Sequence, residues 1–108
     1  MAANNYGASL KDHNSFEEAR LLLRKTIPVA RRVLGQSHRI TLTMRLFYAR
    51  ALYEDEGATL DDVREAVTTL EDAGRTARRV FGGAHPTTTE IEIQLQGARL
   101  VLRAHESS

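Results

Sequence analysis

Two stretches, FEEARLLLRKTIPVARRVLGQSH at residues 16–38 and VREAVTTLEDAGRTARRVFGGAH at residues 63–85, are related copies that decide the fold of this chain. They align without a gap at an offset of 47 positions, and ten pairs of identical residues fall between residues 16–41 and the equivalent positions. The identical residues include Ala30–Val33 with Ala77–Val80, Gly35 with Gly82, His38 with His85, and Thr41 with Thr88. Such self-similarity predicts one structural unit that is used twice.

Each copy begins with an amphipathic helix whose apolar residues recur every three or four positions and so share one face. The two stripes are Phe16, Ala19, Leu23, Ile27, Ala30 and Leu34 in the first copy, and Val63, Ala66, Val67, Leu70, Ala73, Ala77 and Phe81 in the second. Thr59 precedes the second helix in a variant of the capping box, and Gly35 and Gly82 are typical helix ends. We therefore expect helices over residues 16–34 and 60–81.

A second helix is expected in each copy, over residues 39–54 and 86–104, and Pro86 suits a first helical position. Residues 89–96, TEIEIQLQ, alternate with the period of a strand. Helix is still favoured there, because Glu and Gln are good helix formers and a lone strand would have no partner in this chain. Gly74, in the middle of a predicted helix, is expected to permit close helix packing.

These elements predict an all-α fold of four antiparallel helices. The length of 108 residues corresponds to about one domain. We expect a flexible N-terminal tail over residues 1–14, a helical domain over residues 15–104 built from 47-residue repeats at 14–60 and 61–107, and a C-terminal tail over residues 105–108.

Composition excludes several classes of function. Fifteen Lys and Arg against fourteen Asp and Glu give a net charge of +1, which supplies no basic field for binding nucleic acid or a membrane surface. The chain has no cysteine, hence no disulfide and no thiolate metal site. No stretch is apolar enough to span a membrane, and MAANNYGASLKDHNS lacks the features of a signal peptide. A cytoplasmic location is expected.

No catalytic residue, metal site or cofactor is predicted. His38 and His85 share a repeat position, but each follows a glycine turn and opens a helix, which favours a structural role over a metal or acid–base site. The carboxylates of Asp61, Asp62 and Glu65 cluster where a helix dipole explains them. A basic stripe on the first helix is expected to be a solvated face; it contains Arg20, Arg24, Lys25, Arg31 and Arg32.

Short motifs in both copies resemble the tetratricopeptide repeats of the kinesin light chain type. The matching residues are Glu17-Glu18-Ala19, Val33-Leu34-Gly35, His38, Thr41 and Leu42 in the first copy, and Glu65-Ala66, Val80-Phe81-Gly82, His85-Pro86 and Thr88 in the second. The resemblance covers Phe16 to Arg103. It implies a short right-handed αα superhelix, in which residues 39–54 and 86–104 are inner helices and residues 16–34 and 60–81 are outer helices. An insertion, Ala58 to Asp62, departs from the family pattern.

Three classes of function follow, with a protein-binding module favoured over a structural subunit and over an enzyme. Repeat proteins of this architecture bind partners on the concave surface that their inner helices line. The predicted groove for a peptide or helix of a protein partner consists of Arg39, Thr43, Leu46 and Arg50 on the first inner helix, and Glu90, Ile93, Gln94 and Gly97 on the second. Each of these residues could instead be ordinary surface.

Self-association is also expected, because repeat units bury their apolar faces mainly against neighbouring units and about three are needed for stability. The terminal helices should expose apolar side chains, and such patches mark contact sites. The expected contact residues are Leu21, Leu22, Leu100 and Val101, either in a symmetric homodimer or on another subunit of a larger complex.

Overall fold

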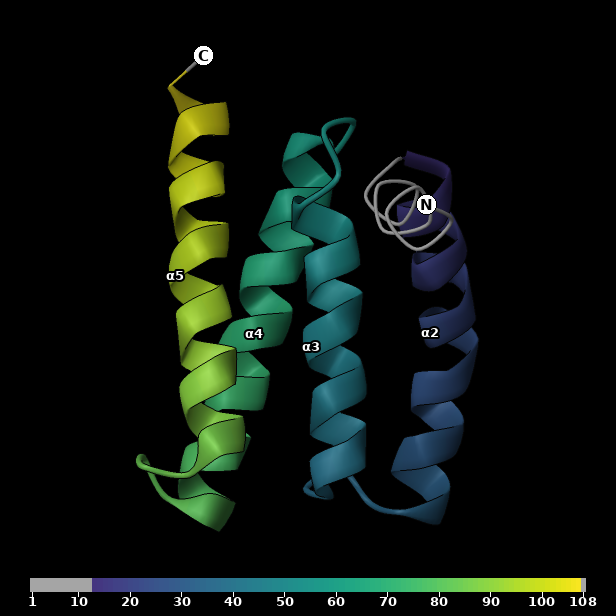
Figure 1. The fold of residues 1–108 in the computed structure, drawn as a ribbon, viewed down its shortest axis with the longest axis vertical. Coiled ribbons are helices and arrows are strands. Elements are labelled where there is room, and N and C mark those ends of the chain that lie inside the picture. The colour runs from purple at the N-terminus through teal and green to yellow at the C-terminus, as the bar shows by residue number, and fades with distance from the viewer. Residues whose placement is uncertain (1–12, 108) are drawn as a thin grey trace, which may run out of the picture.

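The computed structural model describes residues 13–107, which form four helices and no strand. The helices are α2 (His13–Val33), α3 (Arg39–Tyr53), α4 (Leu60–Phe81) and α5 (Pro86–Glu106). Consecutive helices run in opposite directions, with α3 between α2 and α5 and with α4 behind (Figure 1). The all-α prediction is confirmed, including a helix over the alternating residues 89–96.

Two predicted helix boundaries are wrong, by three residues at the start of α2 and by two residues at the end of α5. Helix α2 begins at His13, so residues 13 and 14 are helical rather than part of a tail. Helix α5 continues to Glu106 because neither glycine nor proline follows Ala104, and the backbone N–H of Ser107 still donates to the carbonyl of Arg103. The rest of the predicted N-terminal tail, residues 1–12, lies outside the described residues, as does residue 108.

Helix ends follow the sequence signals in both copies. Gly35 and Gly82 have positive φ angles of 98° and 89°, a conformation that glycine adopts without the strain a Cβ would cause. His38 and His85 are the N-caps of α3 and α5, and their Nδ1 atoms accept the backbone N–H groups two residues later at 3.1 Å. The structural role predicted for both histidines is confirmed, and so is the capping box at Thr59.

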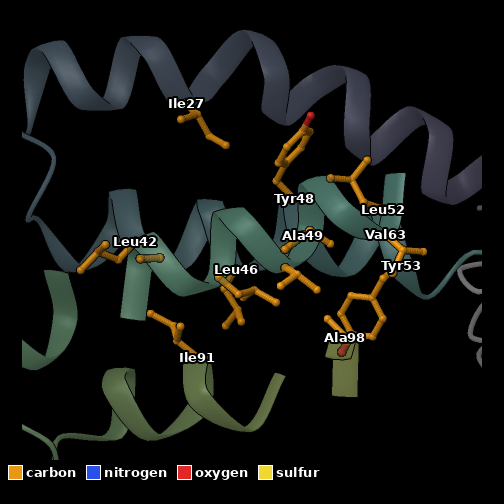
Figure 2. Close-up of a cluster of buried hydrophobic side chains, with 14 of the residues drawn as sticks. Ile27, Leu42, Leu46, Tyr48, Ala49, Leu52, Tyr53, Val63, Ile91 and Ala98 are labelled. Atoms are coloured by element: carbon orange, nitrogen blue, oxygen red, sulfur yellow. The ribbon is translucent and has the colours of Figure 1, made fainter. Parts of the chain in front are cut away.

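Helix α3 is the centre of the core and contacts α2, α4 and α5. In Figure 2, Ile27 of α2 and Ile91 of α5 point from opposite sides toward the side chains of α3. Burial is complete for Leu42, Leu52, Val63, Leu70 and Ile91. Since α3 is surrounded on three sides, its exposed face is narrow, which constrains the site described below.

Gly74 does not provide the close packing that was expected of it. A Cβ at this position would meet Cγ2 of Ile91 at 3.6 Å, an ordinary van der Waals contact. We therefore expect Gly74→Ala to raise the free energy of unfolding by about 0.5–1 kcal/mol, because alanine restricts the unfolded chain and favours helix.

Gly97→Ala is the matched comparison, and urea denaturation measures both variants. A Cβ at Gly97 would lie 3.2 Å from the hydroxyl of Tyr53, tighter than most real contacts, so the gain should shrink or reverse. A loss of stability in Gly74→Ala would show that α4 and α5 cannot accept the added methyl group.

Candidate functional site

A hollow of about 310 Å³ lies between the inner helices α3 and α5. Its lining comprises Thr43, Leu46, Phe47, Pro86, Thr87 and Glu90. Three predicted groove residues, Thr43, Leu46 and Glu90, are thus brought together from helices that are distant in sequence. The prediction for Leu46 is wrong in one respect: its side chain is only 5% exposed, because α3 is surrounded, and it belongs to the core.

Two further hollows lie between α2 and α3. The larger, of about 600 Å³, is bordered by Leu23, Arg39, Ile40, Thr43, Met44 and Phe47. The smaller, of about 200 Å³, is bordered by Ser15, Phe16, Ala19, Phe47, Arg50, Ala51 and Glu54. Arg39 and Arg50, both predicted groove residues, therefore border the face between α2 and α3 rather than the one between α3 and α5.

Phe47 borders all three hollows, and 49% of its surface is exposed. Phe47 is not among the predicted groove residues, although it directly follows Leu46, which is one of them. The repeat alignment contains the missed signal, since the equivalent of Phe47 in the second copy is the polar residue Gln94. An exposed aromatic ring that borders several hollows is a typical anchor for a protein partner.

Polar contacts involve Arg50 and Tyr53, near the C-terminal end of α3. Nε of Arg50 donates to Oε2 of Glu54 at 2.9 Å, and this hydrogen bond raises the pKa of the guanidinium despite its partial burial. Tyr53 donates its hydroxyl to the side chain of Gln94 across the α3–α5 interface. Burial is the largest cause of the raised pKa of Tyr53, so the phenol stays protonated as a donor.

The second half of the predicted groove is only partly available. Gln94 is engaged with Tyr53, and Gly97 lies against the same hydroxyl. Ile93, by contrast, is 55% exposed. The sequence could not separate these neighbours, because the side chain that occupies the groove comes from α3, 41 residues away in sequence.

A polar cluster on the outer side joins three helices. Nη2 of Arg24 donates to the hydroxyl of Tyr48 at 2.8 Å, and that hydroxyl donates to Glu65. Burial and the hydrogen bond to Glu65 raise the pKa of Tyr48, which keeps it protonated. Sequence reasoning missed this cluster, since no spacing pattern links a residue of α2 to residues of α3 and α4.

A second contact on the same side pairs Arg45 of α3 with Asp72 of α4. Nη2 of Arg45 lies 2.7 Å from Oδ2 of Asp72, and the Arg45 side chain is only 8% exposed. The hydrogen bond from Arg45 lowers the pKa of Asp72. Both contacts hold helices together, which is a structural role rather than a catalytic one.

Three of the four predicted contact residues are exposed, namely Leu21, Leu22 and Leu100, at 52%, 64% and 61%. Val101 is less available than these leucines, because its side chain is half-buried and packs against the core. It lies one position beyond Leu100, which turns it by about 100° around the helix.

The basic stripe on α2 is partly neutralised within the chain. Arg20 lies within 4 Å of Glu17 and Asp62, and Arg24 is bonded to Tyr48. Across residues 13–107, no group of three or more metal-ligating side chains is assembled. No helix in the described part of the chain is long and apolar enough to cross a membrane.

A family model described as tetratricopeptide repeat matches residues 1–40, which include all of α2 and the turn that follows it. The match supports a tetratricopeptide repeat in this chain, and the four-helix architecture is consistent with that fold. Searches of curated proteins and of solved structures found no match. A tetratricopeptide repeat suggests, in general, a module for protein–protein interaction.

Proposed function

We propose that this protein is a non-enzymatic adaptor that binds a peptide or helix of a partner protein on the concave surface of α3 and α5. The observation that carries the proposal is the exposed ring of Phe47, which borders the hollow between α3 and α5 and also the two hollows described between α2 and α3. Hydrophobic anchors surrounded by polar groups are the usual arrangement of a peptide site. Here Thr43, Thr87 and Glu90 supply the polar rim.

The chemistry of the surface suggests the kind of ligand. The hollow between α3 and α5 has an apolar floor formed by Leu46, while its rim includes the hydroxyl groups of Thr43 and Thr87 and the carboxylate of Glu90. A ligand with one aromatic or aliphatic anchor and flanking hydrogen-bond donors would satisfy both. Such a segment is expected to lie across the two inner helices.

Selection of displayed peptides on the immobilised protein tests the proposal. Peptides that bind in the hollow should lose at least about tenfold in affinity when Phe47 is replaced by alanine, because truncating a central anchor typically costs 1–2 kcal/mol or more. The fold should be retained, since half of the ring is already exposed.

Val80→Ala provides the control, because Val80 is a similarly exposed apolar residue, at 46%, on the outer helix α4. Peptides that lose affinity equally in both variants bind elsewhere, and peptides unaffected by Phe47→Ala contradict the proposed site. The second candidate function is a structural subunit or self-associating protein without a dedicated peptide ligand, favoured by the exposed leucines of α2 and α5.

A further inference from the structure

The 47-residue repeat assigns an equivalent to each position of α2 on α4 and to each position of α3 on α5. The equivalence holds in the structure, because α2 and α4 begin at equivalent residues, His13 and Leu60, and α3 and α5 begin at Arg39 and Pro86. Equivalent residues should have similar burial unless one copy lacks a neighbour that the other copy has. Differences in burial therefore locate missing neighbours.

Helix α5 exposes apolar side chains at positions that are buried on α3. Ile93 is 55% exposed where its equivalent, Leu46, is 5% exposed. Leu100 is 61% exposed where its equivalent, Tyr53, is 8% exposed. On α3, this face packs against the next inner helix: Leu46 borders a hollow with residues of α5, and Tyr53 is bonded to Gln94. Among the described residues, α5 has no such neighbour.

The groove between α2 and α3 also lacks a neighbouring helix in the described part of the chain, in this case an inner helix. Outer helix α4 lies between two inner helices, α3 and α5, whereas α2 contacts α3 alone among the inner helices of residues 13–107. Leu23 is consequently half-exposed where its equivalent, Leu70, is fully buried. The hollow of about 600 Å³ beside Leu23 is where an inner helix would lie.

We propose that α5 of a second copy of this chain occupies the groove between α2 and α3, so that copies associate head to tail. In this arrangement, α5 of one copy packs against α2 of the next copy. This contact is equivalent to the packing of α3 against α4 within one chain. The inference goes beyond the proposed peptide site because it adds the outer helix α2 and the free face of α5, but it shares Phe47 with that site, so a docked helix and a peptide would compete for this side chain. It also replaces the symmetric dimer with a heterologous contact, which generates a ring or an open array.

Apolar residues meet at the equivalent positions. Within the chain, Leu46 borders the same hollow as Thr87 and Glu90, and these two residues are equivalent to Ile40 and Thr43. Ile93 of the second copy would therefore cover Ile40, which is 44% exposed.

The second apolar contact follows in the same way from the packing of Tyr53. This residue lies against Gln94 and Gly97, which are equivalent to Phe47 and Arg50. Leu100 of the second copy would therefore cover Phe47, which is 49% exposed.

Charge is also complementary at the position that joins inner and outer helices. Within the chain, Arg45 of α3 pairs with Asp72 of α4. Their equivalents are Glu92 on α5 and Lys25 on α2, a pair with the two signs exchanged. Within its own chain Glu92 already accepts hydrogen bonds from Arg78, the shortest at 2.7 Å, so Lys25 of the next copy would add a second cation beside this carboxylate.

A comparison of Leu22 with Leu21 distinguishes the proposed contact between copies from ordinary exposed surface. The equivalent of Leu22 is Thr69, which borders a hollow with Arg45 and Tyr48 of α3. The equivalent of Leu21 is Thr68, which is exposed on α4. Only Leu22 should therefore face a docked helix, although both leucines are exposed.

Sedimentation velocity across a dilution series is the first test. The unmodified chain and Leu21→Glu should associate as concentration rises, whereas Leu22→Glu should remain monomeric at every concentration, with helical circular dichroism unchanged. Leu22 is substituted rather than Phe47, because Phe47 also borders the proposed peptide site. Peptide binding by the Leu22→Glu monomer can therefore be measured independently of association. Equal association of the two variants overturns the proposal.

Cross-linking establishes the direction of the contact, because the chain has no cysteine of its own. Lys25→Cys and Glu92→Cys proteins, one carrying a size tag, are treated with a short bis-maleimide. The proposal predicts covalent dimers only in the mixture of the two variants, and a ladder when one chain carries both substitutions.

Cross-linking of either single variant alone would show a symmetric interface and overturn the proposal. Monomers at all concentrations would overturn it as well.

Discussion

Leu70→Ala is expected to lower the free energy of unfolding by about 2–5 kcal/mol, the usual cost of truncating a buried leucine in a core that cannot collapse around the cavity. Leu70 is fully buried on α4 and belongs to the core that unites the helices. Urea denaturation followed by circular dichroism measures the change. Protein concentration must be held constant, because self-association would add to the apparent stability.

Leu21→Ala is the control for this experiment, since Leu21 is 52% exposed on α2. A change within about 0.5 kcal/mol is expected there, as for most surface substitutions. If Leu70→Ala cost no more than Leu21→Ala, the assignment of Leu70 to the centre of the core would be wrong.

Thr41→Val and Thr88→Val are expected to stabilise the protein, each by about 1–3 kcal/mol. These threonines share a repeat position, both are fully buried, and neither hydroxyl has a hydrogen-bond partner among the described residues. An unsatisfied buried hydroxyl costs roughly that much, and a methyl group of similar shape removes the cost. Both residues are β-branched, so helix propensity changes little. Thermal and urea unfolding measure the gain.

Thr43→Val distinguishes this explanation from a general benefit of valine. Thr43 lies on the same helix as Thr41, but it is half-exposed and its hydroxyl donates to the carbonyl of Arg39 at 2.8 Å. No gain is expected from its replacement. Destabilisation by Thr41→Val would mean that a buried water satisfies the hydroxyl.

The candidate surface shows the limits of periodicity. Helical spacing placed Leu46 in the groove and did not select Phe47, whereas in the structure Leu46 is buried and Phe47 is exposed. A broad apolar face gives no means of choosing which of two adjacent residues is covered, because that depends on how many helices surround it. A comparison of equivalent positions in the two copies would have predicted that Phe47 lies at the surface, since the polar residue Gln94 occupies the same place in the repeat.

The sequence by itself determined the four helices of residues 13–107 and the ends that carry a capping signal. Apolar spacing, the capping box at Thr59, the glycines at 35 and 82 and the histidine caps are local signals, each acting within a few residues, so they can be read without knowing the fold. The internal repeat likewise determined which helices are equivalent.

Only the tertiary structure decided which equivalent residues are buried. Ile93 and Leu46 occupy the same repeat position, yet one is exposed and the other is in the core, because α3 has a following inner helix among the described residues and α5 does not. The cluster of Arg24, Tyr48 and Glu65 depends in the same way on three helices meeting. Burial depends on neighbours that are distant in the chain, and no local pattern encodes them.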